Sequence, residues 1–148
     1  MRKAFAICSA LLFAGLASGP VLGQGSTLEL RYGPEQTVFG SCKPSLTLVN
    51  RSGRALDYVQ VDVDYRFRDG RAALAEHKSR YRTGFASPIG PGEQRLLNIH
   101  HDESVPLGAA CSEIVAARIV AAECNGDAPG SCQVLAPPVG GDLALPAR

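Results

Sequence analysis

The four cysteines that follow the first 25 residues are the side chains best suited to chemistry: Cys42, Cys111, Cys124 and Cys132. Thiols form disulfides or bind zinc. Because no two of these cysteines have the Cys-x-x-Cys spacing common in zinc sites, we predict two disulfides, with a zinc site as the alternative. Four cysteines allow three pairings. The turn-rich stretch 125–131 favours a Cys124–Cys132 bridge, which leaves Cys42 to pair with Cys111.

Histidines are the next candidates, because imidazole binds Zn²⁺ and Cu²⁺. His100 and His101 precede Asp102 and Glu103, and His77 could act as a distant third ligand. Adjacent side chains of an extended segment point to opposite faces, however, so two neighbouring histidines rarely bind one ion. We therefore expect a solvated loop, no metal and no cofactor. A periplasmic metal-handling protein using His77, His100 and His101 is the alternative function.

Basic side chains gather on both sides of Asp69-Gly70, a dipeptide that strongly favours a hairpin turn. If the two flanking strands pair, these side chains form a positive stripe that could bind an acidic partner. The alternative is a solvated, exposed hairpin. Asp62 and Asp64 could flank a substrate or a Ca²⁺ ion, but we expect them to pair with the neighbouring arginines on a solvated strand face. The candidate partner-binding residues are Arg66, Arg68, Arg71, Arg80 and Arg82, with Lys78 beside them.

The sequence contains no motif typical of an enzyme. There is no nucleophile elbow, no phosphate-binding loop and no His-Glu-x-x-His pair, and we predict a non-enzymatic protein. The 15 basic and 14 acidic residues nearly balance, which gives no indication of a nucleic-acid surface. Asn50-Arg51-Ser52 fits a glycosylation acceptor or, as we expect in a bacterial protein, only a turn.

The N-terminal residues have the layout of a secretory signal. Arg2 and Lys3 precede the apolar run 4–17, and small residues follow to Gly23. The run is too short to span a bilayer comfortably. We therefore predict a cleaved signal peptide over 1–23, export to the periplasm or beyond, no stable membrane insertion, and an oxidising compartment that suits disulfides. The Ala-, Gly- and Arg-rich composition points weakly to a bacterium.

Hydrophobic alternation predicts the elements that position these side chains. The clearest pattern runs over 59–68, where every second residue from Val59 to Phe67 is apolar and the others are polar. For residues 71–85 we favour a returning strand, with a short helix as the alternative. Further strands are expected over 27–32, 41–49, 95–99, 111–124 and 132–136. We expect one domain over 24–136 and a flexible tail over 137–148.

Seven short strands separated by turns predict an all-β, antiparallel, two-layer β-sandwich with disulfides. The strand order, the third strand ending at Asp69-Gly70, the Pro91-Gly92-Glu93 turn and the positions of Cys42 and Cys111 resemble immunoglobulin or fibronectin type III domains. They look most like the single-domain versions that bacteria export, of which the interleukin-receptor-mimic family is one.

The chain departs from antibody domains at two places. It has no Trp in the third strand, and Ala109 stands where a tyrosine-corner residue is expected. The resemblance implies a protein partner. We expect it to be bound through strand edges, loops or the Arg-rich hairpin, and exposed edges also suit a homodimer.

Overall fold

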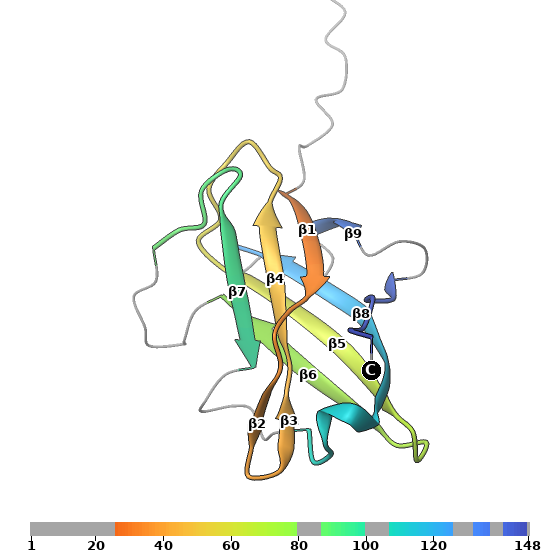
Figure 1. The fold of residues 1–148 in the computed structure, drawn as a ribbon. Helices are drawn as coiled ribbons and strands as arrows, with labels where there is room; N and C mark the ends of the chain where they lie inside the picture. Colours follow the sequence, from red (N-terminus) through yellow and green to blue (C-terminus); the bar gives the residue numbers. More distant parts are fainter. Residues whose placement is uncertain (1–25, 80–86, 100–106, 126–131, 137–140, 148) are drawn as a thin grey trace, which may run out of the picture.

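The computed structural model describes residues 26–79, 87–99, 107–125, 132–136 and 141–147 (Figure 1). The predicted signal peptide lies outside these residues. The described part is all-β, as predicted, and no helix in it is long and apolar enough to cross a membrane. One short 3₁₀ helix, η1, spans Cys111–Glu113. The nine strands are β1 (Ser26–Tyr32), β2 (Gln36–Val38), β3 (Ser41–Lys43), β4 (Ser45–Asn50), β5 (Val59–Phe67), β6 (Ala72–Lys78), β7 (Gln94–Ile99), β8 (Ile114–Cys124) and β9 (Cys132–Ala136).

Seven strands form one hydrogen-bonded sheet in the order β8-β5-β6-β7-β4-β1-β9, and β2 and β3 form a separate hairpin. All neighbours are antiparallel except β1 and β9, which run parallel and so differ from the all-antiparallel prediction. Only two residue pairs join β6 to β7. At this short seam the sheet changes direction. In Figure 1, β1, β4 and β7 cross in front of the diagonal strands β5, β6 and β8.

The core follows the alternation in the sequence. On β5 the residues at every second position from Val59 to Phe67 are at most 3% exposed, whereas Arg66 between them is exposed. Leu28 of β1, Leu46 of β4 and Leu97 of β7 are buried as well. Burying a large aliphatic side chain contributes about 1.5–3 kcal/mol. The alternating segments are therefore the main source of stability for the sheet.

The segment after Asp69-Gly70 forms the favoured strand and not the helix over Ala72–Lys78, whereas residues 80–85 of the expected strand lie outside the described residues. Its first residues, rich in Ala and Leu, have helix-forming composition, but β6 pairs with β5 from Arg66↔Ala72 to Gln60↔Lys78. Pairing with a strand whose inner face is fully buried outweighs a weak local preference for helix. Gly70 has a φ of 87°, which the tight turn requires.

Two expected strands and the expected tail differ in the structure, and the strand expected over 111–124 begins only at Ile114, after η1. The expected strand over 41–49 is divided into β3 and β4 at Pro44, because proline has no N–H for the ladder. Part of the expected flexible tail packs against β8. The N–H of Leu143 donates to the Ala117 carbonyl at 2.8 Å, and the backbone of Asp142 forms an isolated antiparallel β-bridge with that of Arg118. Leu143 is only 5% exposed. Since β8 is an edge strand, its outer backbone groups need partners, and residues 142–143 supply them.

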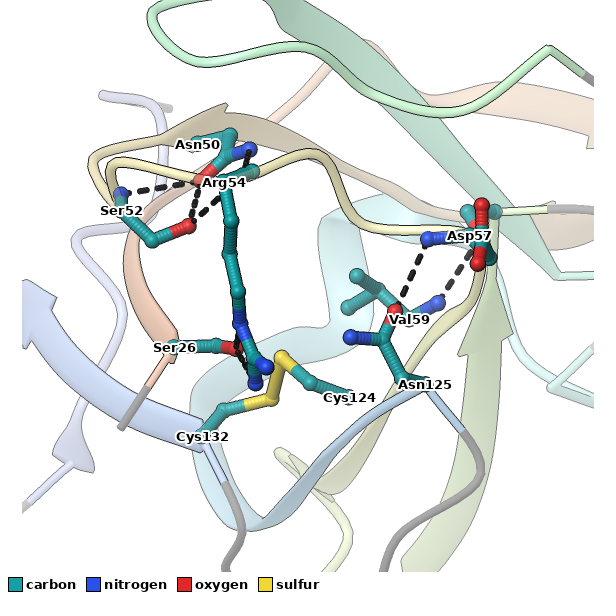
Figure 2. Close-up of a disulfide and its surroundings, with 10 residues drawn as sticks. Ser26, Asn50, Ser52, Arg54, Asp57, Val59, Cys124, Asn125 and Cys132 are labelled. Atoms are coloured by element: carbon teal, nitrogen blue, oxygen red, sulfur yellow. Dashed lines mark hydrogen bonds between the residues drawn. A yellow bond between two sulfur atoms is a disulfide. The ribbon is translucent and has the colours of Figure 1, made fainter. Parts of the chain in front are cut away.

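Two disulfides join the chain in the favoured pairing. The Cα atoms are 4.6 Å apart in Cys42–Cys111 and 5.6 Å apart in Cys124–Cys132. Cys124 ends β8 and Cys132 begins β9, so the second bridge ties together the first and last strands of the sheet order (Figure 2). The first bridge ties β3 to η1.

Candidate partner-binding site

The described basic side chains near Asp69-Gly70 each lie beside an acid. Three of the pairs lie along one strand or turn at short range, and Arg68 is 3.9 Å from Glu113 of η1. Arg80 and Arg82 lie outside the described residues. Of the two acids expected to pair with arginines, Asp64 does so, whereas Asp62 accepts from the Gln60 amide at 3.0 Å. The short pairs are Arg66–Asp64 at 2.7 Å, Arg71–Asp69 at 2.6 Å and Lys78–Glu76 at 2.7 Å.

His77 lies in the core and not in a metal site. Its side chain is fully buried, and Nε2 lies 2.8 Å from the hydroxyl oxygen of Tyr65. Burial lowers the pKa of His77 to about 4, against a smaller opposing effect of the Leu97 backbone. Burial also raises the pKa of Tyr65, so both side chains are neutral at pH 7. A histidine held in this way is not accessible to a metal; His100 and His101 lie outside the described residues.

One further group of potential ligand atoms occurs in the described part of the chain, where Glu35 lies close to Cys42 and Cys111. The two sulfur atoms are bonded to each other, so neither is a thiolate. Zinc binding by cysteine requires thiolates. The group therefore does not have the chemistry of a metal site.

Asn50 closes a turn, and its side chain is not accessible to a glycan (Figure 2). It is fully buried, its Nδ2 donates to the carbonyls of Arg54 and Ile89 at 2.8 and 2.9 Å, and its Oδ1 accepts from the N–H of Ser52 at 2.9 Å. Glycosylation would have to replace one of these bonds. The turn interpretation of the Asn50-Arg51-Ser52 motif is therefore the one that fits the folded domain.

The feature that the sequence analysis missed is the tip of the β2–β3 hairpin. Val38 pairs with Ser41, so Phe39 and Gly40 alone form the turn, with φ values of 49° and 77°. Two-residue turns of this kind need positive φ at both positions and normally contain Asn-Gly or Asp-Gly. A bulky residue with positive φ is a conformational outlier. The sequence does not indicate this turn, because Phe39 stands where a turn-forming residue such as Asn or Asp is expected.

The Phe39 side chain is also fully exposed, at 103% of its reference surface. It is the one aromatic among the large apolar side chains that the described residues leave exposed. The others are spread singly over four strands, which is ordinary for a protein surface. They are Leu74 of β6, Leu96 of β7, Val115 and Val120 of β8, and Leu135 of β9.

The hairpin that carries Phe39 is firmly held at its base. The N–H of Cys42 donates to the Ala109 carbonyl at 2.7 Å, and the Leu107 N–H donates to the Cys42 carbonyl at 3.1 Å. The Gly108 N–H donates to the Ser41 hydroxyl at 2.7 Å, and the Cys42–Cys111 bridge adds a covalent tie. In Figure 1 the hairpin extends past the lower end of β4 and β7. Phe39 is thus displayed on a rigid support.

We compared the chain with protein-family models, curated proteins and solved structures, and none of them matches it. The candidate site is therefore defined by the geometry of this chain alone. Its defining residues are Phe39 and Gly40 at the tip, β2 and β3 below them, and the bracing segment 107–111.

Proposed function

We propose that this chain is an exported, non-enzymatic binding domain that recognises a protein partner through the tip of the β2–β3 hairpin. The observation that carries the proposal is Phe39, which is fully exposed and has a φ of 49°. An exposed aromatic ring and an unfavourable backbone conformation both reduce stability. Such features cluster at binding sites, where a large rigid side chain can fill a pocket of the partner.

The charge of the hairpin favours a protein over a membrane or a nucleic acid. Residues 35–43 contain one acid, Glu35, and one base, Lys43. A membrane-bound surface combines several apolar side chains with basic residues, and a nucleic-acid surface needs a basic patch. A single aromatic side chain on a neutral, braced hairpin suits an apolar pocket in a folded protein.

The fold we propose for this function is an immunoglobulin-like β-sandwich. The adjacency of β1, β4 and β7, and that of β5 and β8, supports this, because the corresponding strands neighbour each other in immunoglobulin domains. The parallel pairing of β9 with β1 is a departure, since the last strand usually pairs with the sixth. Export is supported by the two disulfides and by the signal-like layout of residues 1–23.

A photo-crosslinking amino acid at position 39 tests the function. The full chain, residues 1–148, is expressed in its own host with benzoyl-phenylalanine in place of Phe39, and the cells are illuminated. We expect one dominant protein adduct. The same probe at Leu74, which is 66% exposed on β6, serves as the matched control and should give little product. Equal adduct patterns from the two positions, or none from position 39, would contradict the proposal.

Affinity measurements with the captured protein then show whether the β2–β3 or the β5–β6 hairpin binds it. We expect Phe39→Ala to weaken binding at least tenfold, because the ring no longer fills a pocket. Arg66→Glu on the charge-paired hairpin should leave binding within twofold, since Arg66 already pairs with Asp64. The opposite result, loss with Arg66→Glu and none with Phe39→Ala, would move the site to the Arg-rich hairpin.

A further inference from the structure

The two edges of β3 are both occupied. One edge pairs with β2, and the other faces residues 107–109. On that second side the N–H of Cys42 donates to Ala109 and its carbonyl accepts from Leu107. Both main-chain polar groups of Cys42 therefore point away from β2.

This geometry determines the direction of the backbone groups of Thr37, which lies opposite Cys42 in the register. Opposed residues of an antiparallel pair either exchange both of their hydrogen bonds or exchange none. Since Cys42 directs its groups to the other side, Thr37 and Cys42 exchange none. The N–H and the carbonyl of Thr37 consequently point outward from the free edge of β2.

Nothing in the described residues uses these two groups. Thr37 is exposed. Among the described residues, no backbone hydrogen bond outside the strand ladders involves it, and it exchanges none with Cys42. An outward N–H and carbonyl on an exposed edge form a template for another strand. The edge residues Gln36, Thr37 and Val38 include no charge and no proline, the features that commonly protect an edge from pairing.

We propose that the partner supplies an extended strand that pairs with the outer edge of β2, with its backbone hydrogen-bonded to Thr37 and Phe39 entering an apolar pocket beside that strand. This inference rests on the proposed function and names the kind of partner that the same hairpin binds. In strand addition, main-chain hydrogen bonds fix direction and register, and side-chain pockets supply specificity. Only Thr37 contributes outward groups within the three residues of β2, so Phe39 provides most of the affinity.

The test removes one hydrogen-bond donor and leaves the hairpin ladder unchanged. Thr37→Pro removes the outward N–H, and proline is tolerated on an edge strand where the N–H faces away from the ladder. Thr37→Ala is the matched control, because it removes the side chain and keeps the N–H. The probe is the protein captured by crosslinking at position 39. We expect Thr37→Pro to weaken its binding at least tenfold and Thr37→Ala to change it less than twofold.

A second measurement does not depend on the folding of a variant. Amide hydrogen exchange of the wild-type chain should show fast exchange at Thr37 and slow exchange at Cys42, whose N–H is bonded to Ala109. Adding the captured protein should slow exchange at Thr37 at least tenfold. Unchanged exchange at Thr37 in the complex would overturn strand addition even if Thr37→Pro fails to fold.

The outcomes distinguish this inference from the proposed function. If Phe39→Ala abolishes binding while Thr37→Pro and Thr37→Ala both bind as the wild type does, the hairpin is the binding site and strand addition is wrong. If position 39 gives no adduct, both proposals fail. If Thr37→Pro alone among the Thr37 variants loses binding and the Thr37 amide becomes protected, the partner adds a strand.

Discussion

The β5–β6 and β2–β3 hairpins differ in how well their turn residues suit the backbone conformation of the turn. At the β5–β6 turn, Asp69-Gly70 is a favoured dipeptide, the Asp69 carboxylate accepts from the Arg71 N–H at 3.0 Å, and Arg71 lies over the Phe67 ring at 5.5 Å. Those contacts hold the pKa of Asp69 below its usual value, first through the backbone of Arg71 and then through its side chain. At the β2–β3 turn, by contrast, Phe39 has the wrong shape for its φ and contacts only solvent.

This contrast favours the β2–β3 hairpin as the functional one. A turn whose residue types, charges and conformation all agree needs no partner to explain it. A turn that breaks two rules at once is stable only because the surrounding structure holds it, here through Cys42–Cys111 and segment 107–109. The charged hairpin stands out in the sequence, but the neutral hairpin is the one that we propose as the binding site.

Of the changes proposed, removing the Cys42–Cys111 bridge should lower the free energy of unfolding the most. The two cysteines are separated by 69 positions in sequence, and the loop-entropy model gives about 4 kcal/mol for this bridge. It gives about 2.5 kcal/mol for Cys124–Cys132, whose sequence separation is 8. We expect Cys42→Ala/Cys111→Ala to lower the free energy of unfolding by about 4 kcal/mol in urea titrations. Binding through Phe39 should weaken as well, because its support loosens.

The double variant Cys124→Ala/Cys132→Ala is the control for that experiment. It should lose less stability and keep binding of the captured partner within about twofold at temperatures where it remains folded, because this bridge joins β8 to β9 and does not touch the β2–β3 hairpin. A larger binding loss in this control would show that Phe39 depends on the sheet edges and not on the bridge at its base.

Acid should destabilise the sheet through His77, which is buried on β6. The pKa of His77 is about 4 when folded and about 6.5 when unfolded, so the unfolded chain binds more protons between these values. The contribution of His77 to the free energy of unfolding is therefore fully present above pH 6.5. It falls as the pH decreases towards 4, by about 3 kcal/mol in all. Urea titrations at several pH values measure this loss.

The variant His77→Leu should remove most of that pH dependence, although it also leaves the Tyr65 hydroxyl without its partner and lowers stability at pH 7. Tyr65→Phe serves as the comparison, because it keeps His77 and its proton uptake. An unchanged slope of stability against pH between 6.5 and 4 in His77→Leu would assign the acid response to other groups.

Much of the fold could be predicted from the sequence because it depends on burial. The alternation from Val59 to Phe67 requires one buried face, and the even set of cysteines in a signal-like chain indicates disulfides. The parallel pairing of β9 and the packing of Leu143 could not be predicted, since both depend on which edge of the sheet lies within reach of the C-terminal residues. Long-range placement of that kind leaves no local periodicity.

The candidate site was hidden for a different reason. The arginines near Asp69-Gly70 stand out by composition, yet the acids of Arg66 and Arg71 lie two residues away on the same strand or turn, and the pairing depends on side-chain geometry. Phe39 alone carries no motif. It becomes a candidate only when the register Val38↔Ser41 places it in a turn position with its side chain fully exposed.

The smallest expected change in stability, and the most discriminating, comes from Phe39→Asn. Asparagine tolerates positive φ and creates the Asn-Gly dipeptide that this turn favours, so the free energy of unfolding should rise by about 0.5–1 kcal/mol. Binding of the captured partner should fall at least tenfold, because the ring is lost. A gain in stability with a loss of binding is the signature of a residue kept for contact.

The reverse exchange at the other turn completes the comparison. Asp69→Phe places an aromatic residue before Gly70 and removes the acceptor for the Arg71 N–H, so stability should fall while partner binding stays unchanged. Urea titration and affinity measurements on both variants give the result. If Phe39→Asn instead lowers stability, the ring supports the hairpin itself, and its exposure in the free domain would no longer indicate a partner.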